Sequence, residues 1–270
     1  MTQPAPTHGT IDVETIGRTR RLTINRPAKK NALDSRLMAL LLEEISAAEA
    51  NESIHVIVLR GAGGNFSSGY DISEYENDAD SQEGSIAKAR AIVARAERIL
   101  NCRIPIIAQV SGYCLAGATD IVLASDFLFA GRSARIGHPA VRRFGAVPPW
   151  SYWIYRIGVQ QAKRLMLQGE LISGEDARRI GLALHVMDDE ALDDAVLEFA
   201  DRMGRVSRDC LTANKDVLNV GVDLMGGSRL THFSTWAAIV ARSSPQAGAF
   251  SRARTGEQQP PRELRRVSTI

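Results

Sequence analysis

The sequence contains few of the residues that define specialised protein classes. Only three of the 270 residues are cysteines (Cys102, Cys114 and Cys210), and no two form a Cys-x-x-Cys pair, so neither a disulfide framework nor a cysteine zinc site is indicated. The five histidines also lack metal-ligand spacing, and we expect no metal. No apolar run approaches the ~18 residues of a membrane span, and no secretory signal is evident at the start. These absences favour a soluble, cytoplasmic protein with reduced cysteines.

The sequence also has no strong excess of charge of either sign. Its 33 basic and 31 acidic residues give a net charge of +2. From Arg252 onward, five arginines and two glutamates contribute +3, so the rest of the chain sits at −1. A nearly neutral body gives no reason to expect nucleic acid as the main partner. A solvated, disordered end explains the arginines better than a contact with RNA or an acidic surface.

The apolar content is enough for one sizeable core. Hydrophobic residues make up 44% and charged residues 24% of the chain, which is ordinary for a globular protein. The length indicates one main domain with terminal additions. We expect a flexible start at residues 1–9, a core at 10–200, a helical region at 201–250 and a disordered basic tail at 251–270.

Hydrophobic periodicity predicts alternating strands and helices. Two alternating segments around Gly17 predict a hairpin of strands 11–16 and 20–24. Asp34 is the expected N-cap of a helix with an apolar stripe at Leu37, Leu40, Leu41 and Ile45. Further strands are expected at 55–59, 106–110, 127–129 and 184–187, helices at about 86–100, before 126 and from 152 onward, and a mobile loop at 73–84. The alternation predicts an α/β fold.

Several common catalytic signatures are absent. Gly61 and Gly63 follow a buried strand, as in a dinucleotide-binding fingerprint, but Phe66 stands where the third glycine belongs. No Lys-Ser/Thr pair follows, which excludes a phosphate-binding loop of the nucleotide triphosphatases. A Gly-x-Ser-x-Gly elbow of the serine hydrolases is also missing.

Two glycine-containing turns remain, each between a buried strand and an expected helix. They are Asn65–Ile72 and Ser111–Asp120. Glycine at such turns lets backbone N–H groups point outward, and two converging donors form a site for a carbonyl oxygen that becomes an oxyanion. On spacing alone, the simpler interpretation is favoured, in which both are tight turns whose glycines satisfy the backbone geometry.

Four segments in order carry a resemblance to a known family. Leu22–Pro27 with Asn31–Leu33 is similar to the block N-R-P-x-x-x-N-A-L, and Asn65–Ile72 is similar to F-x-[AS]-G-x-D-[IL]. Ser111–Asp120 is similar to N-G-x-x-x-G-G-G-x-E, and Leu167–Gly181 to L-T-G-x-x-[IL]-x-A-x-x-A-x-x-x-G-L. These are blocks of the crotonase superfamily, the enoyl-CoA hydratase/isomerase family. One block would be weak, but all four in the family order over about residues 10–220 are specific.

The resemblance implies a fold and a type of chemistry. The implied fold is α/β, a crotonase-like spiral of ββα units followed by a helical C-terminal oligomerisation region that makes trimers, often paired into hexamers. Such proteins bind acyl-CoA thioesters, as in fatty acid metabolism, and stabilise the enolate of the thioester carbonyl. Coenzyme A is part of the substrate, and no separate cofactor is implied.

Site residues carried over from the resemblance fall into two groups. The oxyanion donors would be the backbone N–H groups of Tyr70 and Gly117, so the side chain at 70 is not decisive. Substrate and CoA binding would fall to Arg26, Lys29, Ser68, Tyr70 and Ile72. Backbone around Ser68, Tyr70 and Ile72 would hold the adenine end, and Arg26 and Lys29 the phosphates. A solvated surface is an equally open interpretation of Arg26 and Lys29.

The acid–base residues depart from the family pattern. Asp120 stands where hydratases carry their first catalytic glutamate, three residues past Gly117. Ala140 replaces the second glutamate, and Pro148 stands where dienoyl isomerases carry another acid. His138 lies in the same turn as Ala140 and is a candidate acid–base group, although a structural histidine is the commoner case. Trp150, Tyr152 and Trp153 line either an acyl pocket or the core.

The resemblance therefore predicts an acyl-CoA enzyme of the hydratase/isomerase type with Asp120 as its main acid–base group. Without a second carboxyl group, ordinary syn-hydration is doubtful. Double-bond isomerisation, C–C hydrolysis and decarboxylation compete with it. A non-catalytic acyl-CoA-binding member is the alternative from another class.

Overall fold

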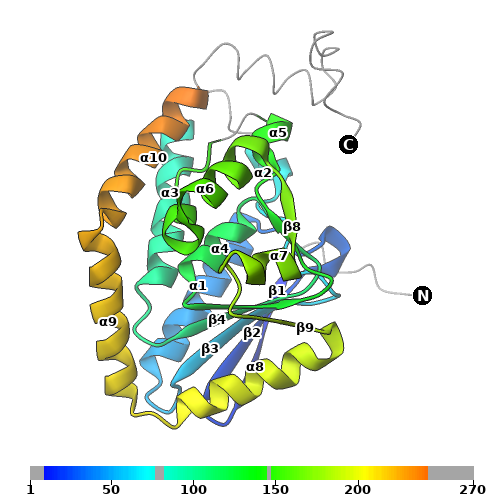
Figure 1. Cartoon of the computed structure of the whole chain (residues 1–270), viewed down its shortest axis with the longest axis vertical. Helices are drawn as coiled ribbons and strands as arrows, with labels where there is room; N and C mark the ends of the chain where they lie inside the picture. The colour runs from blue at the N-terminus through cyan, green and yellow to red at the C-terminus, as the bar shows by residue number, and fades with distance from the viewer. Residues whose placement is uncertain (1–8, 77–81, 145–146, 243–270) are drawn as a thin grey trace.

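The computed structural model describes residues 9–76, 82–144 and 147–242 (Figure 1). Nearly all of the predicted flexible start and the whole predicted tail at 251–270 lie outside the described residues. Of the predicted loop at 73–84, residues 77–81 also lie outside them.

Six strands form the larger sheet, in the order β1-β2-β3-β4-β6-β9. β1 and β2 make the predicted antiparallel hairpin, and every other pair in this sheet is parallel. β4 is buried along its whole length, as expected for a strand with helices on both faces. The strands are β1 (Thr10–Ile16), β2 (Thr19–Asn25), β3 (Val56–Gly61), β4 (Ile106–Val110), β6 (Phe127–Gly131) and β9 (His185–Met187).

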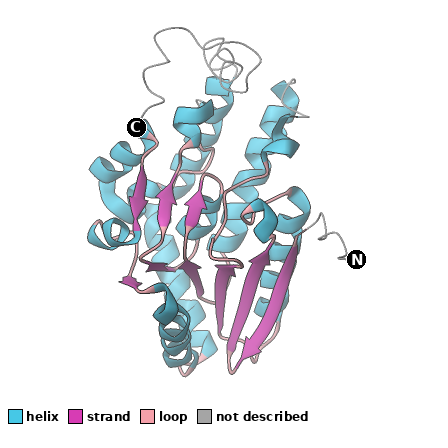
Figure 2. Ribbon diagram, turned by 90° about the vertical axis from the view of Figure 1, so that its right-hand side faces the viewer, coloured by secondary structure: helices cyan, strands magenta, loops and turns pink. Residues whose placement is uncertain are grey.

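A smaller sheet of three short strands stands above the larger one (Figure 2). Its order is β5 (Tyr113–Leu115), β7 (Arg135–Gly137) and β8 (Leu171–Ser173). β5 follows β4 along the chain and β7 follows β6, so the chain passes from one sheet to the other in each unit. After β3, an isolated bridge from Ser67 to Cys114 begins the same pattern. The expected spiral of ββα units is confirmed.

Helices cover both faces of the larger sheet. α1 (Ser35–Ala50), α3 (Gln82–Leu100) and α4 (Ala118–Ala124) enclose the main core on one side, and α8 (Asp189–Gly204) packs a second apolar cluster on the other. The predicted cap of α1 is confirmed, because the Asp34 carboxylate accepts from the Leu37 N–H at 2.7 Å. Of the predicted stripe, Leu37, Leu41 and Ile45 are buried, and Leu40 is half-buried.

The remaining helices lie around the small sheet and along one edge of the molecule. α10 packs along α3, and α9 runs down the edge beside it (Figure 1). Lys215 is the only buried residue of α9. These elements are η1 (Pro27–Lys29), α2 (Ile72–Glu76), α5 (Ala140–Phe144), α6 (Trp153–Gln168), α7 (Gly174–Arg179), α9 (Arg208–Leu224) and α10 (Gly227–Arg242).

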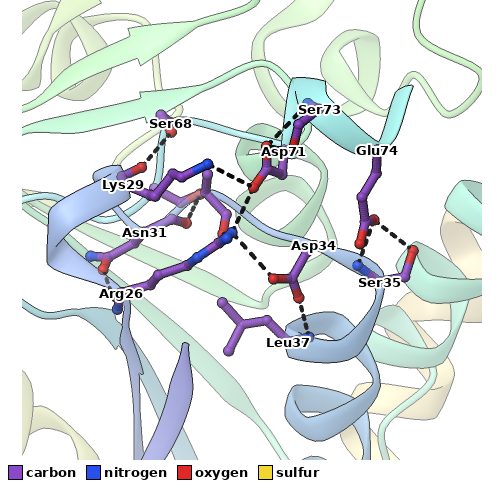
Figure 3. Close-up of polar contacts among 12 residues, drawn as sticks. Arg26, Lys29, Asn31, Asp34, Ser35, Leu37, Ser68, Asp71, Ser73 and Glu74 are labelled. Atoms are coloured by element: carbon purple, nitrogen blue, oxygen red, sulfur yellow. Dashed lines mark hydrogen bonds and ion pairs between the residues drawn. The ribbon is translucent and has the colours of Figure 1, made fainter. Parts of the chain in front are cut away.

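Two predictions need correction. The expected mobile loop at 73–84 contains α2 and the first turn of α3, which begins at Gln82 rather than near residue 86. α2 forms because the Asp71 carboxylate accepts from the N–H and hydroxyl of Ser73, while Glu74 accepts from Ser35 (Figure 3). The small sheet was not predicted, because three-residue strands show no periodicity and form only when neighbouring segments pair with them.

A buried arginine joins three of these elements (Figure 3). A guanidinium nitrogen of Arg26 lies 2.8 Å from Asp71 Oδ2 and 3.2 Å from Asp34 Oδ2, and it donates to the Ala32 carbonyl at 3.1 Å. The side chains of Arg26, Asp34 and Asp71 are each less than a tenth exposed. Because Asp34 caps α1 and Asp71 caps α2, one cation fixes the end of β2 to the starts of both helices.

We expect Arg26→Met to destabilise the fold strongly, because two buried carboxylates would lose their cation. Removing one member of a buried ion pair costs about 3–5 kcal/mol, measured as the free energy of unfolding in urea. Arg205→Met is the matched control, since Arg205 pairs with Asp201 at the exposed end of α8, and its midpoint should not move. Equal, small effects of the two variants would contradict the prediction.

Candidate active site

The first glycine-containing turn is held by hydrogen bonds on both sides. The Leu33 N–H donates to the Gly69 carbonyl at 2.8 Å and the Asp71 N–H to the Leu33 carbonyl at 2.9 Å, which makes a parallel bridge between Leu33 and Tyr70. On the other side, the Leu115 N–H donates to the Ser67 carbonyl at 3.1 Å. The turn is therefore fixed between the start of α1 and β5.

Close backbone contact explains two of the glycines. Gly69 has a φ of +97°, and a Cβ there would lie 2.6 Å from the Leu115 carbonyl oxygen and 3.2 Å from the Gly117 nitrogen. A Cβ on Gly117 would lie 2.2 Å from two ring atoms of Tyr70. Side chains at these positions would overlap their neighbours. The structure thus brings the two glycine-containing turns into direct contact, at Tyr70 and Gly117.

Asp120 lies in the first turn of α4, which Gly117 precedes as N-cap. The residue is 3% exposed, and its Oδ2 accepts from the Tyr70 hydroxyl at 3.3 Å. Oδ1 has no hydrogen-bond partner within the described part of the chain. Burial raises the pKa of Asp120 to about 8, and the Tyr70 hydrogen bond opposes that rise. The group therefore titrates near neutrality.

His138 follows β7 directly and is close in the backbone to the second turn. Leu115 pairs with Gly137, and the Ala116 N–H donates to the Gly137 carbonyl at 2.9 Å. The imidazole is buried, and its Nδ1 has no partner among residues 9–76, 82–144 and 147–242. Burial lowers the pKa of His138 to about 4, so the ring is neutral at pH 7. Ala140 begins α5 in the same segment.

The three aromatic residues after Pro148 belong to the main core. Trp150 and Trp153 are fully buried, and the rings of Trp150 and Tyr152 stack with centroids 4.2 Å apart and planes 8° apart. Tyr70 packs against the same cluster. The indole nitrogens of Trp150 and Trp153 lack a hydrogen-bond partner in the described residues. Cys114 is buried here as well, and its thiol pKa is raised by burial and by the charge of Asp120.

The expected CoA-binding residues divide into buried and exposed groups. Arg26 is buried and engaged with Asp34 and Asp71, whereas the Lys29 side chain is 55% exposed and its Nζ lies 3.8 Å from Asp71. The Ser68 hydroxyl donates to the Lys29 carbonyl at 3.3 Å (Figure 3). Ile72 opens α2 and is 40% exposed. Lys29, Ser68 and Ile72 therefore lie at the surface beside Tyr70.

Asp71 has a structural place in this group. Burial alone would raise the pKa of its carboxyl, but hydrogen bonds from Ser73 and Arg26 and the charge of Lys29 outweigh burial and hold the pKa below its usual value. Asp71 is therefore ionised at neutral pH and keeps its ion pair with Arg26.

Two side chains that shape the candidate site were not predicted from the sequence. The Tyr70 side chain, treated as not decisive, reaches Asp120 across fifty residues. Asn31 is fully buried and donates to the Ala62 and Asn65 carbonyls at 2.8 and 2.7 Å, which closes the glycine-rich turn that follows β3. The block N-R-P-x-x-x-N-A-L marked Asn31, but nothing in one sequence links residue 70 to residue 120.

Two cavities of the described structure lie away from Tyr70 and Asp120. A cavity of about 720 Å³ lies between β1, β2 and Gly61–Gly64, and one of about 300 Å³ lies beside Arg156 and Arg178. Neither is lined by Tyr70 or Asp120. Within the ranges that the structure describes, no group of three or more His, Cys, Asp or Glu residues could hold a metal ion. No helix in these ranges is long and apolar enough to cross a bilayer.

Comparisons with known proteins agree on one family. Residues 18–235 match the family model for enoyl-CoA hydratase/isomerase. A probable enoyl-CoA hydratase of Rhizobium meliloti (strain 1021) is 31% identical over 218 residues, 80% of this chain and 83% of that relative. The 2,3-dehydroadipyl-CoA hydratase of Escherichia coli (strain K12) is 32% identical over 201 residues, 73% of this chain and 76% of that protein.

The fold comparison gives the same answer. The crystal structure of an enoyl-CoA hydratase/isomerase from Xanthobacter autotrophicus Py2 superposes with a TM-score of 0.86 at 28% identity, over 97% of this chain and 96% of that one. An enoyl-CoA hydratase from Mycobacterium smegmatis superposes with a TM-score of 0.84 at 28% identity, over 96% and 93% of the two chains. The chain therefore belongs to the enoyl-CoA hydratase/isomerase family of acyl-CoA-processing enzymes.

Proposed function

We propose that this protein binds an acyl-CoA thioester and stabilises its enolate between the main-chain N–H groups of Tyr70 and Gly117. The observation that carries the proposal is the direct contact of the two glycine-containing turns beside a buried carboxyl group that titrates near neutrality. Two fixed donors aimed at one oxygen stabilise the negative charge that develops there, and each is worth about 3–4 kcal/mol in the transition state. No cofactor beyond the coenzyme A of the substrate is needed.

The coenzyme A end would lie over the exposed edge of the site. Lys29, with an exposed ammonium group, would meet a phosphate, and backbone near Ser68, Tyr70 and Ile72 would hold the adenine. Arg26 is assigned to the scaffold instead, because its guanidinium already faces two buried carboxylates.

Asp120 would act as the acid–base group. In an isomerisation, the Asp120 carboxylate takes a proton from a carbon of the acyl chain, and the C–H electron pair moves to the thioester oxygen as the enolate forms. The same carboxyl group then returns the proton to a different carbon, the charge leaves the oxygen, and the double bond has shifted. This reaction needs one carboxyl group and no water, which suits a site in which Ala140 replaces the second acid.

Hydration is the second candidate, and His138 favours it. The imidazole is neutral and buried, its Nδ1 has no partner in the described part of the chain, and the residue before it, Gly137, accepts from the Ala116 N–H. A water that donates to His138 Nδ1 would lose its other proton to the Asp120 carboxylate as the water oxygen bonds to the β-carbon and the electron pair of the double bond moves to the thioester oxygen. Asp120 would then give that proton to the α-carbon as the charge leaves the oxygen. Two of the similar proteins are named as hydratases, which also supports this reaction.

We also propose that the protein works as a homo-oligomer, a trimer or a hexamer, through α9 and α10. These helices expose a series of large apolar side chains, although isolated exposed apolar residues are ordinary on a monomer surface. The series comprises Val217, Leu218, Val220 and Leu224 of α9, Phe233, Trp236 and Val240 of α10, and Met225 between the two helices.

The proposed reaction is tested with a panel of short, long, branched, aromatic and alicyclic CoA thioesters, read by mass spectrometry. At least one thioester should be converted, and Asp120→Asn should lower its kcat about 100-fold or more while thioester binding persists. Asp201→Asn, on the exposed face of α8, is the control and should keep full turnover. If no thioester is converted, the protein is a binding member of the family and the proposed reaction is wrong.

Asp120 should also make stability depend on pH. Its pKa is about 8 in the folded protein and near 3.8 in the unfolded chain, so the folded state holds the proton more tightly. This contribution to stability is complete below pH 4 and is lost as the pH rises to 8. The parent should lose this contribution between pH 4 and pH 8, and Asp120→Asn should not. The unfolding free energy of Asp120→Asn, measured in urea, should therefore rise relative to that of the parent by on the order of 2–5 kcal/mol over this interval. Parallel pH curves for the two proteins would contradict the assignment.

Oligomer formation is tested with Leu218→Glu. Leu218 is 70% exposed on α9, so a carboxylate there should leave the monomer folded but shift sedimentation velocity towards the monomer. Leu167→Glu is the matched control, because Leu167 is 75% exposed on α6. A parent protein that sediments as a monomer, or equal behaviour of the two variants, would rule out this interface.

A further inference from the structure

We propose that the Tyr70 hydroxyl is a positioning group for Asp120, which it holds in the orientation and the ionised state needed to take a proton. The inference rests on the proposed function and extends it, because it gives residue 70 two separate roles. Its main-chain N–H would donate to the oxyanion, and its phenol hydroxyl donates to the Asp120 carboxyl group.

The backbone of Tyr70 has little freedom to move. Residues on both sides of it hydrogen-bond to Leu33, and the next residue, Asp71, is held by the buried Arg26. The ring lies against Gly117, where even a methyl group would overlap it. A fixed backbone and a packed ring leave the hydroxyl one well-defined place, 3.3 Å from Asp120 Oδ2.

The carboxyl group of Asp120 has few other polar neighbours. Two titratable groups interact with it directly, Tyr70 from the segment before α2 and Cys114 from β5, and no cation does so among the described residues. His138, which is neutral, would reach it only through the water of the proposed hydration. Cys114 stays a neutral thiol over the range in which Asp120 titrates, because burial raises its pKa. The phenol is therefore the group in the described structure that favours the ionised form of this buried carboxyl group.

The hydrogen bond also makes the two carboxylate oxygens different. Oδ2 accepts from the phenol, whereas Oδ1 has no partner in the described residues. Oδ1 is then the oxygen available to take the substrate proton, and its lone pair is aimed by the bond that the other oxygen makes. A carboxyl group without this bond could rotate and would be protonated at a higher pH.

The test is Tyr70→Phe, which keeps the main-chain N–H and the packed ring and removes only the hydroxyl. Loss of one hydrogen bond to a charged group should raise the titration midpoint of Asp120 by about one pH unit. The ascending limb of kcat against pH should move by the same amount, and kcat at pH 7 should fall about tenfold, with KM changed less than twofold. Well above pH 9 the variant should recover most of the parent activity.

Tyr155→Phe is the matched control. Its hydroxyl donates to the Met225 carbonyl at 3.4 Å, away from Asp120, so this variant should leave the pH profile in place. The midpoint of Asp120 is also measured without substrate, by NMR of the carboxyl carbon in 13C-aspartate-labelled protein, with Asp120→Asn to assign the signal.

The outcomes separate this inference from the proposed function. A shifted NMR midpoint in Tyr70→Phe with a shifted kcat limb supports it, whereas an unmoved midpoint, or a loss of kcat equal at every pH, overturns it. If the parent converts no thioester, the proposed function fails, and the NMR midpoint still decides whether Tyr70 sets the protonation of Asp120.

Discussion

The buried guanidinium of Arg26 is the interaction on which the site depends. It joins Asp34, which begins α1, to Asp71, which begins α2, and the residue before Asp71 is Tyr70. A charge in this position is stable only because both carboxylates and the Ala32 carbonyl surround it. The sequence resemblance associates Arg26 with the substrate, and the structure shows its guanidinium in contact with Asp34, Asp71 and the Ala32 carbonyl.

Asp120 differs from Arg26 in its partners. Arg26 is buried with partners, whereas Asp120 is buried with one phenol and no cation in the described part of the chain. An unpaired buried carboxyl group destabilises a fold, and its persistence is typical of positions where a perturbed pKa serves a reaction. The cost of burying this group is limited because burial raises its pKa to about 8, so that most of it is neutral at pH 7, and because Oδ2 accepts from the Tyr70 hydroxyl.

Much of the architecture could be predicted from the sequence, for definite reasons. The hairpin, the cap at Asp34 and the strands of the larger sheet have periodic or apolar patterns, and the four motif blocks identified the family. The small sheet and α2 could not be predicted, because three-residue strands and a five-residue helix depend on partners distant in the chain. The Tyr70–Asp120 contact had no signal for the same reason: the fold alone brings residues 70 and 120 together.

Helix α9 differs from an ordinary surface helix, because polar side chains make several of its inward contacts and large apolar side chains are exposed. Several of its inward contacts are polar: Lys215 reaches Asp126 and the Ile104 carbonyl, and Asn219 donates to the Leu100 carbonyl. Val222 adds an apolar contact with the main core. Its outward side chains include Val217, Leu218 and Leu224, each at least 70% exposed. In an isolated chain, these apolar side chains of α9 are therefore exposed to solvent. In a nanomolar sample that surface would adsorb to vessel walls and chromatography resins, and an apparent loss of protein on dilution would be a consequence of this one helix.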